Sequence, residues 1–282
     1  MKKGLLGFVI IFSLSALVAV FVNSCKKERP DTDTQSSVDN SICEGEFTLM
    51  FSQTNSIAVN DSGVQKWGIP VPMSGCPDAH IDTLDDQNGF PKTLIMAYGS
   101  DADGDSIFET GCTSSDGKTR RGIVRATFSE HWTKNGTTVS HTFDNYYVNG
   151  IKFEGTVTLT RNGNSFTQTV VGGKCTKGSE WTILWDCSRT LTYLVGDSTN
   201  VNDDICLISG SASGTDRNGR AFSVEIDPSS PLKRTICPYI VQGIQTIKID
   251  GKKDRTINYG DGTCDNIAVL TIDGNEFEFQ LQ

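Results

Sequence analysis

The chain has 282 residues, with 25 lysines and arginines against 34 aspartates and glutamates, and 37% of its residues are hydrophobic. Its net charge of −9 argues against a nucleic-acid-binding protein, which needs clustered positive charge to neutralise phosphates. The hydrophobic content is too high for a disordered chain, and 28 glycines with only 4 methionines do not suggest a helical bundle.

Residues 1–24 have the features of a lipoprotein signal peptide. Lys2 and Lys3 precede an apolar run that extends to Val22. The next residues, Asn23-Ser24-Cys25, resemble the end of a bacterial lipobox, although Asn23 departs from the small residue usual at its position. We therefore expect Cys25 to carry a lipid such as palmitate and to anchor the chain in the cell envelope, on the outer membrane; an uncleaved membrane helix is the alternative. Whether the protein faces the periplasm or the exterior stays open.

The segment that follows Cys25 is polar, charged and without periodicity as far as residue 40. We interpret residues 25–41 as the lipidated cysteine with a flexible tether, and residues 42–282 as an all-β domain. No convincing helical periodicity follows residue 25.

Five Asn-Gly or Asp-Gly pairs separate the alternating segments of this domain. They are the strongest short-range signal for β-hairpins, because Asn, Asp and Gly tolerate the positive φ angles of a type I′ turn. The pairs are Asn135-Gly136, Asn162-Gly163, Asn218-Gly219, Asp250-Gly251 and Asp273-Gly274. They predict an antiparallel meander of long hairpins with a sandwich-like core.

A two-residue turn also determines which residues face each other across its hairpin. The Asn135-Gly136 turn predicts a hairpin with one largely apolar face and one polar face, as expected of two antiparallel strands that are buried on one side. The predicted opposite residues are Phe128 and Phe143, Glu130 and His141, His131 and Ser140, Leu159 and Phe166, Leu270 and Phe277, and Ala268 and Phe279.

The cysteines fit an exported protein. Once Cys25 is set aside, an even number remains, which suggests disulfides. No C-x-x-C occurs, so neither a zinc ribbon nor a thioredoxin-type site is indicated. The Asp250-Gly251 turn places Cys237 opposite Cys264, close enough for a bridge. Two further cysteines, Cys76 and Cys112, belong to the repeat described next. No pairing is predicted for Cys43, Cys175, Cys187 and Cys206.

An internal repeat predicts a second bridge. Cys76-Pro77 and Cys237-Pro238 each precede a Tyr-Gly pair by the same number of residues, and a further cysteine follows each pair. By analogy with Cys237 and Cys264, we expect Cys76 to pair with Cys112. A fainter repeat joins the segments that begin at Val148 and Ile208. The order of the repeats suggests two related halves, 42–172 and 173–282.

The chain resembles a family of uncharacterised lipoproteins common in Bacteroidota. The resemblance runs from about Gly75 to the C-terminus, through GCPDAHIDT, FPKTLIMAYG, DGKTRRG, TFDNYYVNG, GSASGTDRNGR and INYGDGTCDNIAVLTIDG. It implies an exported, lipid-anchored β protein and supplies no catalytic residues. This sequence departs from the family in an acidic insertion after Tyr98-Gly99 and in the extra cysteines at 175, 187 and 206.

That acidic insertion is the candidate metal site. Its alternating carboxylates could curl around Ca²⁺, with a backbone carbonyl completing the oxygen ligands. The carboxylates are Asp101, Asp103, Asp105 and Glu109. The loop does not follow the EF-hand pattern, and a solvated acidic loop is the alternative.

A second candidate surface is the strand face that carries Trp181 and Trp185. Aromatic rings on a flat sheet can stack on sugars, so this face could bind glycans; packing in the core is the more ordinary alternative. A zinc hydrolase is disfavoured because the predicted hairpin points His131 and His141 to opposite faces. No nucleophile turn and no phosphate-binding loop occurs.

These features predict a cell-envelope lipoprotein that acts as a non-catalytic structural or binding module without a cofactor. Its expected partners are the membrane, through the lipid, and a glycan or an envelope protein; nucleic acid is not expected. A Ca²⁺-stabilised adhesion or carbohydrate-binding module and an enzyme with an unrecognised site are the alternatives.

Overall fold

In the computed structural model, the described residues are 31–60, 76–81, 89–101, 108–194 and 205–281. Residues Asp31–Gln282 form one unit, and the description concerns this unit alone. Its elements are α1 (Gln35–Asn60), β1 (Asp78–Ile81), β2 (Lys92–Tyr98), β3 (Cys112–Thr113), β4 (Thr119–Phe128), β5 (Thr138–Val148), β6 (Ile151–Asn162), β7 (Ser165–Lys177), β8 (Trp181–Leu194), β9 (Ile205–Thr215), β10 (Ala221–Ile226), β11 (Leu232–Arg234), β12 (Ile240–Ile249), β13 (Arg255–Asp261), β14 (Ile267–Ile272) and β15 (Asn275–Gln280).

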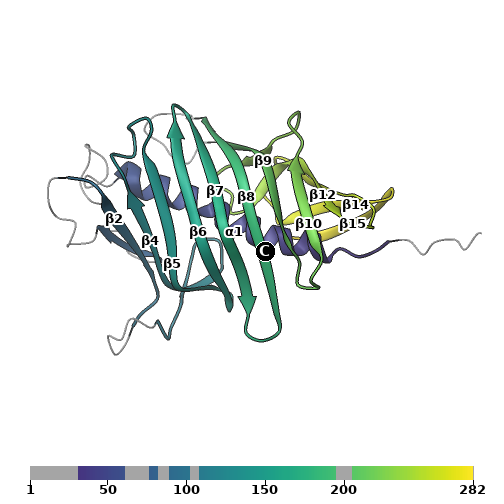
Figure 1. The fold of residues 1–282 in the computed structure, drawn as a ribbon, viewed down its shortest axis with the longest axis horizontal. Helices are drawn as coiled ribbons and strands as arrows, with labels where there is room; N and C mark the ends of the chain where they lie inside the picture. The colour runs from purple at the N-terminus through teal and green to yellow at the C-terminus, as the bar shows by residue number, and fades with distance from the viewer. Residues whose placement is uncertain (1–30, 61–75, 82–88, 102–107, 195–204, 282) are drawn as a thin grey trace, which may run out of the picture. The chain divides into compact units, whose positions relative to one another are not determined.

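The strands form one antiparallel sheet in which neighbours along the chain are mostly neighbours in space (Figure 1). Strands β10 and β11 both lie between β9 and β12, one following the other along the same position in the sheet, and each pairs with both neighbours. The predicted all-β meander of long hairpins is thus confirmed. The sheet is continuous across residue 172, because β7 pairs with both β6 and β8.

The side chains alternate between the two faces of this sheet. In β8, Ile183, Trp185, Cys187, Arg189 and Leu191 point inward and are buried, whereas the residues between them are exposed. This period of two is the burial pattern of strands that have one face on a core and the other in solvent.

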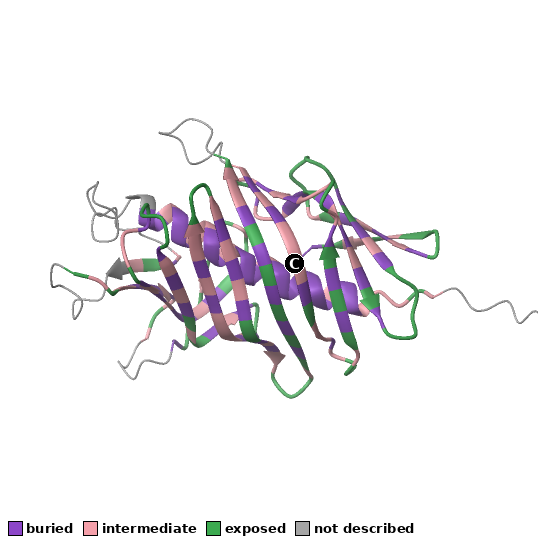
Figure 2. Cartoon of the chain, turned by 45° about the horizontal axis from the view of Figure 1, so that its top comes forward, coloured by how far each residue is buried: buried purple, intermediate pink, exposed green. Residues whose placement is uncertain are grey.

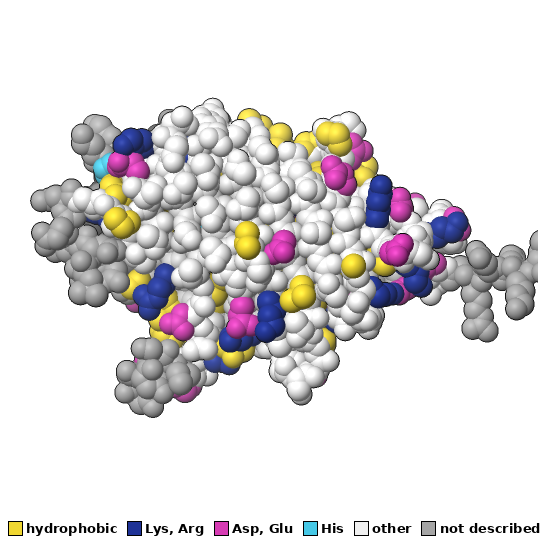
Figure 3. Space-filling view, viewed as in Figure 1, with side chains coloured by type: hydrophobic (Ala, Val, Ile, Leu, Met, Phe, Trp, Pro, Cys, Tyr) yellow, Lys and Arg dark blue, Asp and Glu magenta, His cyan; other side chains and the backbone are white. Residues whose placement is uncertain are grey.

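The outer face is rich in hydroxyl side chains, and over its middle few charged groups appear (Figure 3). One row of directly paired positions crosses seven strands from β2 to β9: Thr93, Thr127, Ser140, Thr158, Thr169, Ser188 and Ser211. Threonine suits a strand because its branched side chain packs well on the pleated surface, and hydroxyl pairs add cross-strand contacts.

Helix α1 crosses the strands on the inner face of the sheet, and Figure 2 shows it buried along almost its whole length. This helix corrects the expectation that no helix follows residue 25. It also places Ser36–Asn40, expected to belong to a flexible tether, in the buried interior. The Asp33 carboxylate accepts a hydrogen bond from the Gln35 backbone N–H at 3.1 Å and so satisfies one of the free N–H groups at the start of the helix.

The polar side chains of α1 are buried because the inner face of the sheet supplies partners for them. The Trp185 indole donates to Asn40 at 2.8 Å, and the Trp132 indole donates to Asn55 at 2.9 Å. The acidic residues pair with arginines: Asp39 with Arg217, Glu44 with Arg189, and Glu46 with Arg120. Because these groups surround the helix on most sides, it lacks the one-sided apolar stripe of a surface helix.

All five predicted turn pairs lie where one strand reverses into the next. Only one of the four predicted registers is confirmed: Leu270 faces Phe277 and Ala268 faces Phe279 across the Asp273-Gly274 turn. There both central residues have positive φ, 49° and 78°, which is what a two-residue type I′ turn requires.

The other three predicted registers are wrong because the turns are built differently. Around Asp250-Gly251, Ile244 faces Asn258, one residue away from the predicted pairing, and Cys237 and Cys264 form their bridge outside the paired strands. Residues 129–137 form a longer loop, so Phe128 faces Val139, and His141 faces Ala126 instead of Glu130. In the next hairpin, Asn162 pairs with Ser165, which makes Gly163 and Asn164 the central residues and moves Arg161 opposite Phe166. The errors at Asn135-Gly136 and Asn162-Gly163 are even-numbered slips, so each residue that stays in a strand keeps its predicted face of the sheet.

Both predicted disulfides are present, Cys76–Cys112 and Cys237–Cys264. The repeats behind them correspond in the fold, because each Cys-Pro pair precedes a hairpin whose second strand carries the Tyr of the Tyr-Gly pair. Those tyrosines, Tyr98 and Tyr259, are both buried.

Candidate functional site

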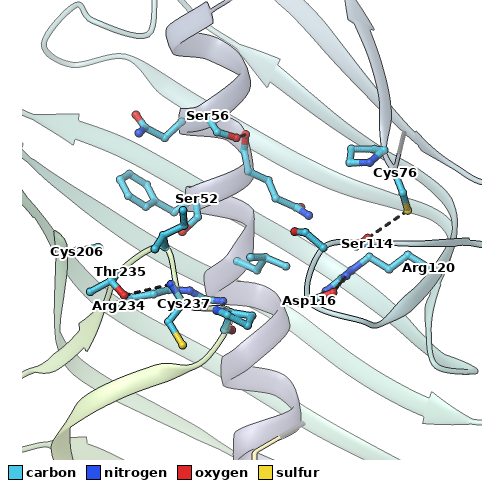
Figure 4. Close-up of a pocket in the computed structure, with 18 of the residues that line it drawn as sticks. Ser52, Ser56, Cys76, Ser114, Asp116, Arg120, Cys206, Arg234, Thr235 and Cys237 are labelled. Atoms are coloured by element: carbon cyan, nitrogen blue, oxygen red, sulfur yellow. Dashed lines mark hydrogen bonds and ion pairs between the residues drawn. The ribbon is translucent and has the colours of Figure 1, made fainter. Parts of the chain in front are cut away.

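A cavity of about 470 Å³ lies against α1, between the two disulfide-bonded segments. In Figure 4, α1 runs between Cys237 and Thr235 on one side and Ser114, Asp116 and Arg120 on the other. The polar lining residues are Ser52, Gln53, Asn55, Ser56, Ser114, Ser115, Asp116, Arg120, Arg234 and Thr235.

The floor of the cavity is the one accessible stripe of the helix. Between Ser36 and Ala58, the only residues that are not buried are Val38, Gly45, Leu49, Ser52, Gln53 and Ser56. At 100° per residue, these positions fall on a single face. Four of them, Leu49, Ser52, Gln53 and Ser56, line the cavity, so the sheet leaves α1 uncovered where the cavity lies.

The two walls come from the related Cys-Pro segments. Cys76 and Pro77 line one wall, and Cys237 and Pro238 line the other. The disulfides join these segments to Cys112 and Cys264, respectively. Cross-links of this kind restrict the movement of the loops that carry them, which keeps the cavity walls in place.

Arg120 closes one end of the cavity within a satisfied charge network. Its guanidinium donates to Glu46 at 2.9 and 3.1 Å and to both oxygens of Asp116 at 2.7 Å. The Tyr146 hydroxyl donates to Glu46 at 2.5 Å. Burial by itself would raise the pKa of Glu46, but the charge and hydrogen bonds of Arg120 outweigh it and hold that pKa below its usual value.

Arg234 lines the same cavity but has a different set of partners. It is 4% exposed, and its guanidinium donates to the Pro238 carbonyl at 3.0 Å and to the Gly45 carbonyl at 3.4 Å. No carboxylate among the described residues forms an ion pair with it. Burial lowers the pKa of Arg234, since an unneutralised charge is disfavoured away from water.

The remainder of the lining combines hydroxyl groups with apolar surface. The apolar part includes Leu49, Phe51 and Ile236, and the Ile236 side chain is 69% exposed. Ser52 and Thr235 add hydroxyl groups, which can donate or accept hydrogen bonds. The cavity therefore offers both a polar end and an apolar surface to an occupant.

Few titratable side chains are found in the described part of the lining. No histidine is among the described lining residues, and their one carboxylate, Asp116, is held by Arg120. His141 lies elsewhere in the core, where its Nδ1 donates to the Val157 carbonyl and its Nε2 accepts from the Thr54 hydroxyl at 2.6 Å.

Of the two tryptophans predicted to bind glycans, Trp185 is a core residue. It is 1% exposed and stacks on Phe47 of α1 with ring centroids 5.6 Å apart. It therefore cannot offer its ring to a surface ligand, and the alternative of core packing is correct. Trp181 is partly buried, with the Arg217 guanidinium 4.2 Å from its ring centroid.

The predicted calcium loop is only partly within the described residues. Asp101 and Glu109 are described, whereas Asp103 and Asp105 lie outside. No group of three or more metal-binding side chains occurs among the residues that the structure covers. The calcium site stays a prediction.

The remaining cysteines are placed as follows. Cys25 lies outside the described residues, so its lipidation also stays a prediction. Cys43, Cys175, Cys187 and Cys206 are buried thiols, and the sulfur atoms of Cys43 on α1 and Cys175 on β7 are 3.0 Å apart. Over the described part of the chain, no helix is both long and apolar enough to cross a membrane.

Sequence reasoning missed the helix and the arginines that line the cavity. A signal for the helix was present, because Phe47, Met50, Phe51 and Thr54 follow the spacing of one helical face. Arg234 lies three residues before the predicted half-cystine Cys237, but its burial could not be read from that position.

Comparison with known proteins adds no relative: no family model, no curated protein and no solved structure matches the chain.

Proposed function

We propose that the protein is a non-catalytic binding module of the cell envelope, held to the outer membrane by a lipid on Cys25, whose cavity takes a small-molecule ligand. The anchoring part of the proposal is supported by the signal-like residues 1–24 and the lipobox-like sequence before Cys25. Two disulfides support export, because such bonds persist in oxidising compartments. Membership of the Bacteroidota lipoprotein family rests on the sequence motifs alone.

The observation that carries the binding function is the cavity on the accessible stripe of α1. Small-molecule sites are typically preformed concave spaces of about 300–1,000 Å³ with a few convergent polar groups. The cavity has a volume in that range, a helical floor and two disulfide-linked walls. We regard a small polar molecule, such as a fragment of an envelope glycan or peptide, as the class of ligand.

The proposal is tested by filling the cavity. The full chain, purified in detergent, is screened by thermal shift against amino acids, sugars, sugar acids and short peptides, and each hit is titrated by calorimetry. The S52W variant places a large ring on the cavity floor and should abolish binding. The matched control is S188W, on the exposed outer face of β8, which should bind as the wild type does.

If every ligand found binds S52W and the wild type equally well, the cavity is not the binding site. If S52W alone loses binding while both variants keep the melting temperature of the wild type, the cavity is the site.

A further inference from the structure

We infer that the cavity recognises an oxyanion, a carboxylate, sulfate or phosphate group, through the guanidinium of Arg234. The inference deepens the proposed function and rests on it, because it names the chemical class of the ligand.

Arg234 differs from the other buried arginines in its partners. Four arginines are buried in the part of the chain that the structure describes: Arg120, Arg189, Arg234 and Arg255. Three of them contact a carboxylate, which is Glu46 for Arg120, Glu44 for Arg189 and Asp31 for Arg255. Arg234 contacts only carbonyl oxygens. A buried charge without a counter-ion is strongly unfavourable, so this exception calls for an explanation.

The neighbouring carboxylates are already neutralised by other cations. Glu46 and Asp116 both bind Arg120, and the side chain of Lys118 adds a second positive charge close to them. Those two cations balance the two carboxylates, so the charge of Arg234 remains in excess beside the cavity. A negatively charged occupant would compensate for it.

The guanidinium has donors left for such an occupant. It carries five N–H groups, of which two are used by the Pro238 and Gly45 carbonyls. Its planar fork suits the paired oxygens of carboxylate, sulfate or phosphate groups. Figure 4 shows Arg234 beside Thr235 on the wall that faces Ser52, so hydroxyl groups lie around the same space.

The remaining surface sets the shape of the ligand. Leu49, Phe51 and Ile236 offer apolar contact beyond the charged end. A small organic molecule with one oxyanion and a partly apolar body would therefore use both parts of the cavity, whereas an inorganic anion would use only the charged end.

The experiment measures anion binding to the full chain in detergent. Thermal shift and calorimetry are run with sodium sulfate, sodium phosphate and sodium acetate, with sodium chloride holding the ionic strength constant. We expect at least one of these anions to raise the melting temperature of the wild type, and the strongest one distinguishes a carboxylate from a sulfate or phosphate ligand.

The key variant is R234Q, which keeps an amide donor for Pro238 but removes the charge and the fork. It should weaken anion binding by about 10- to 100-fold, the loss expected when charge-assisted hydrogen bonds are removed. The matched control, R125Q, changes a partly exposed arginine on β4 and should bind as the wild type does.

A stability measurement separates a binding role from a structural one. Without anion, R234Q should melt at or above the temperature of the wild type, because it removes an uncompensated buried charge. R189Q should melt well below it, because it leaves Glu44 buried without its partner. If R234Q loses as much stability as R189Q, Arg234 is structural and the inference is overturned.

The binding outcomes also separate this inference from the proposed function. Equal anion affinity of R234Q and the wild type overturns the inference. If no anion binds while neutral molecules bind in a manner that S52W abolishes, the oxyanion inference is wrong and the binding function stands. If S52W affects no ligand of either kind, both fail.

Discussion

Glu46 of α1 and Arg120 of β4 form a two-point ion pair in the interior, with Nη2–Oε2 and Nε–Oε1 distances of 2.9 and 3.1 Å. Both side chains are at most 2% exposed. This pair holds the buried helix against the sheet beside the cavity, and Asp116 and Tyr146 satisfy the remaining hydrogen-bonding groups. The packing of the helix therefore depends on specific polar contacts as well as on apolar burial.

Removing the charge of Glu46 should destabilise the fold strongly. For E46Q we expect a loss of about 3–5 kcal/mol in the free energy of unfolding, because Arg120 loses half of its counter-charge in a buried place. Urea denaturation followed by tryptophan fluorescence measures this loss. The control E154Q removes a carboxylate from a pair that is about one-third exposed, and it should cost less than about 1 kcal/mol. Similar losses for both variants would contradict the role given to the buried pair.

Acidification should destabilise the protein through His141. Burial lowers the pKa of this histidine to about 4, against an ordinary value of about 6.5. Between those values the unfolded chain binds a proton that the folded chain does not, so the free energy of unfolding should fall by about 3 kcal/mol as the pH drops through this window. The H141Q variant should show a flatter dependence between pH 6.5 and 4.5. In H131Q, which removes a partly exposed ring that packs against Phe90, the slope should be retained.

Below that window, Glu46 should add to acid sensitivity. Its pKa is held below the usual 4.5, so its stabilising contribution is complete above that value and is lost as the pH falls through the lower folded-state value. The extra loss of stability below pH 4.5 should be smaller in E46Q than in the wild type. If the free energy of unfolding falls equally in the two proteins below pH 4.5, Glu46 is not the source of this loss.

Opening the Cys237–Cys264 bridge should loosen one wall of the cavity. The bridge joins cysteines 27 positions apart, for which the loss of unfolded-state entropy corresponds to about 3.5 kcal/mol. The C237S/C264S double variant should therefore unfold at lower urea concentration and bind cavity ligands more weakly. Mass spectrometry of the unreduced, denatured protein after alkylation should find both cysteines unmodified in the wild type; modified cysteines would refute the bridge.

Membrane attachment should depend on Cys25. In the native host, the C25A variant should leave the membrane fraction or accumulate as unprocessed precursor, because the lipid has no other attachment point in the proposal. The neighbouring S24A variant keeps a small residue before the cysteine and should fractionate as the wild type does. Unchanged fractionation of C25A would refute lipid anchoring.

Local sequence determined the strands, the positions of the hairpins and the two disulfides. Alternation of side chains and the preferences of Asn, Asp and Gly for positive φ are local properties, so they could be read along the chain. They gave the correct register only at Asp273-Gly274, where the pair itself occupies the two central positions of the turn; at Asn135-Gly136, Asn162-Gly163 and Asp250-Gly251 the geometry of the loop decided the pairing.

Only the tertiary structure decided where the helix lies and what surrounds the cavity. Residues such as Asp39, Glu44 and Glu46 look like solvent-exposed residues in the sequence, because a charge is stable in the interior only when a partner neutralises it. Those partners, Arg217, Arg189 and Arg120, are distant in the sequence and come close only when the sheet forms. Arg234 is the exception among the buried arginines. Its lack of a carboxylate partner becomes visible only when the other charges have been paired in the folded structure.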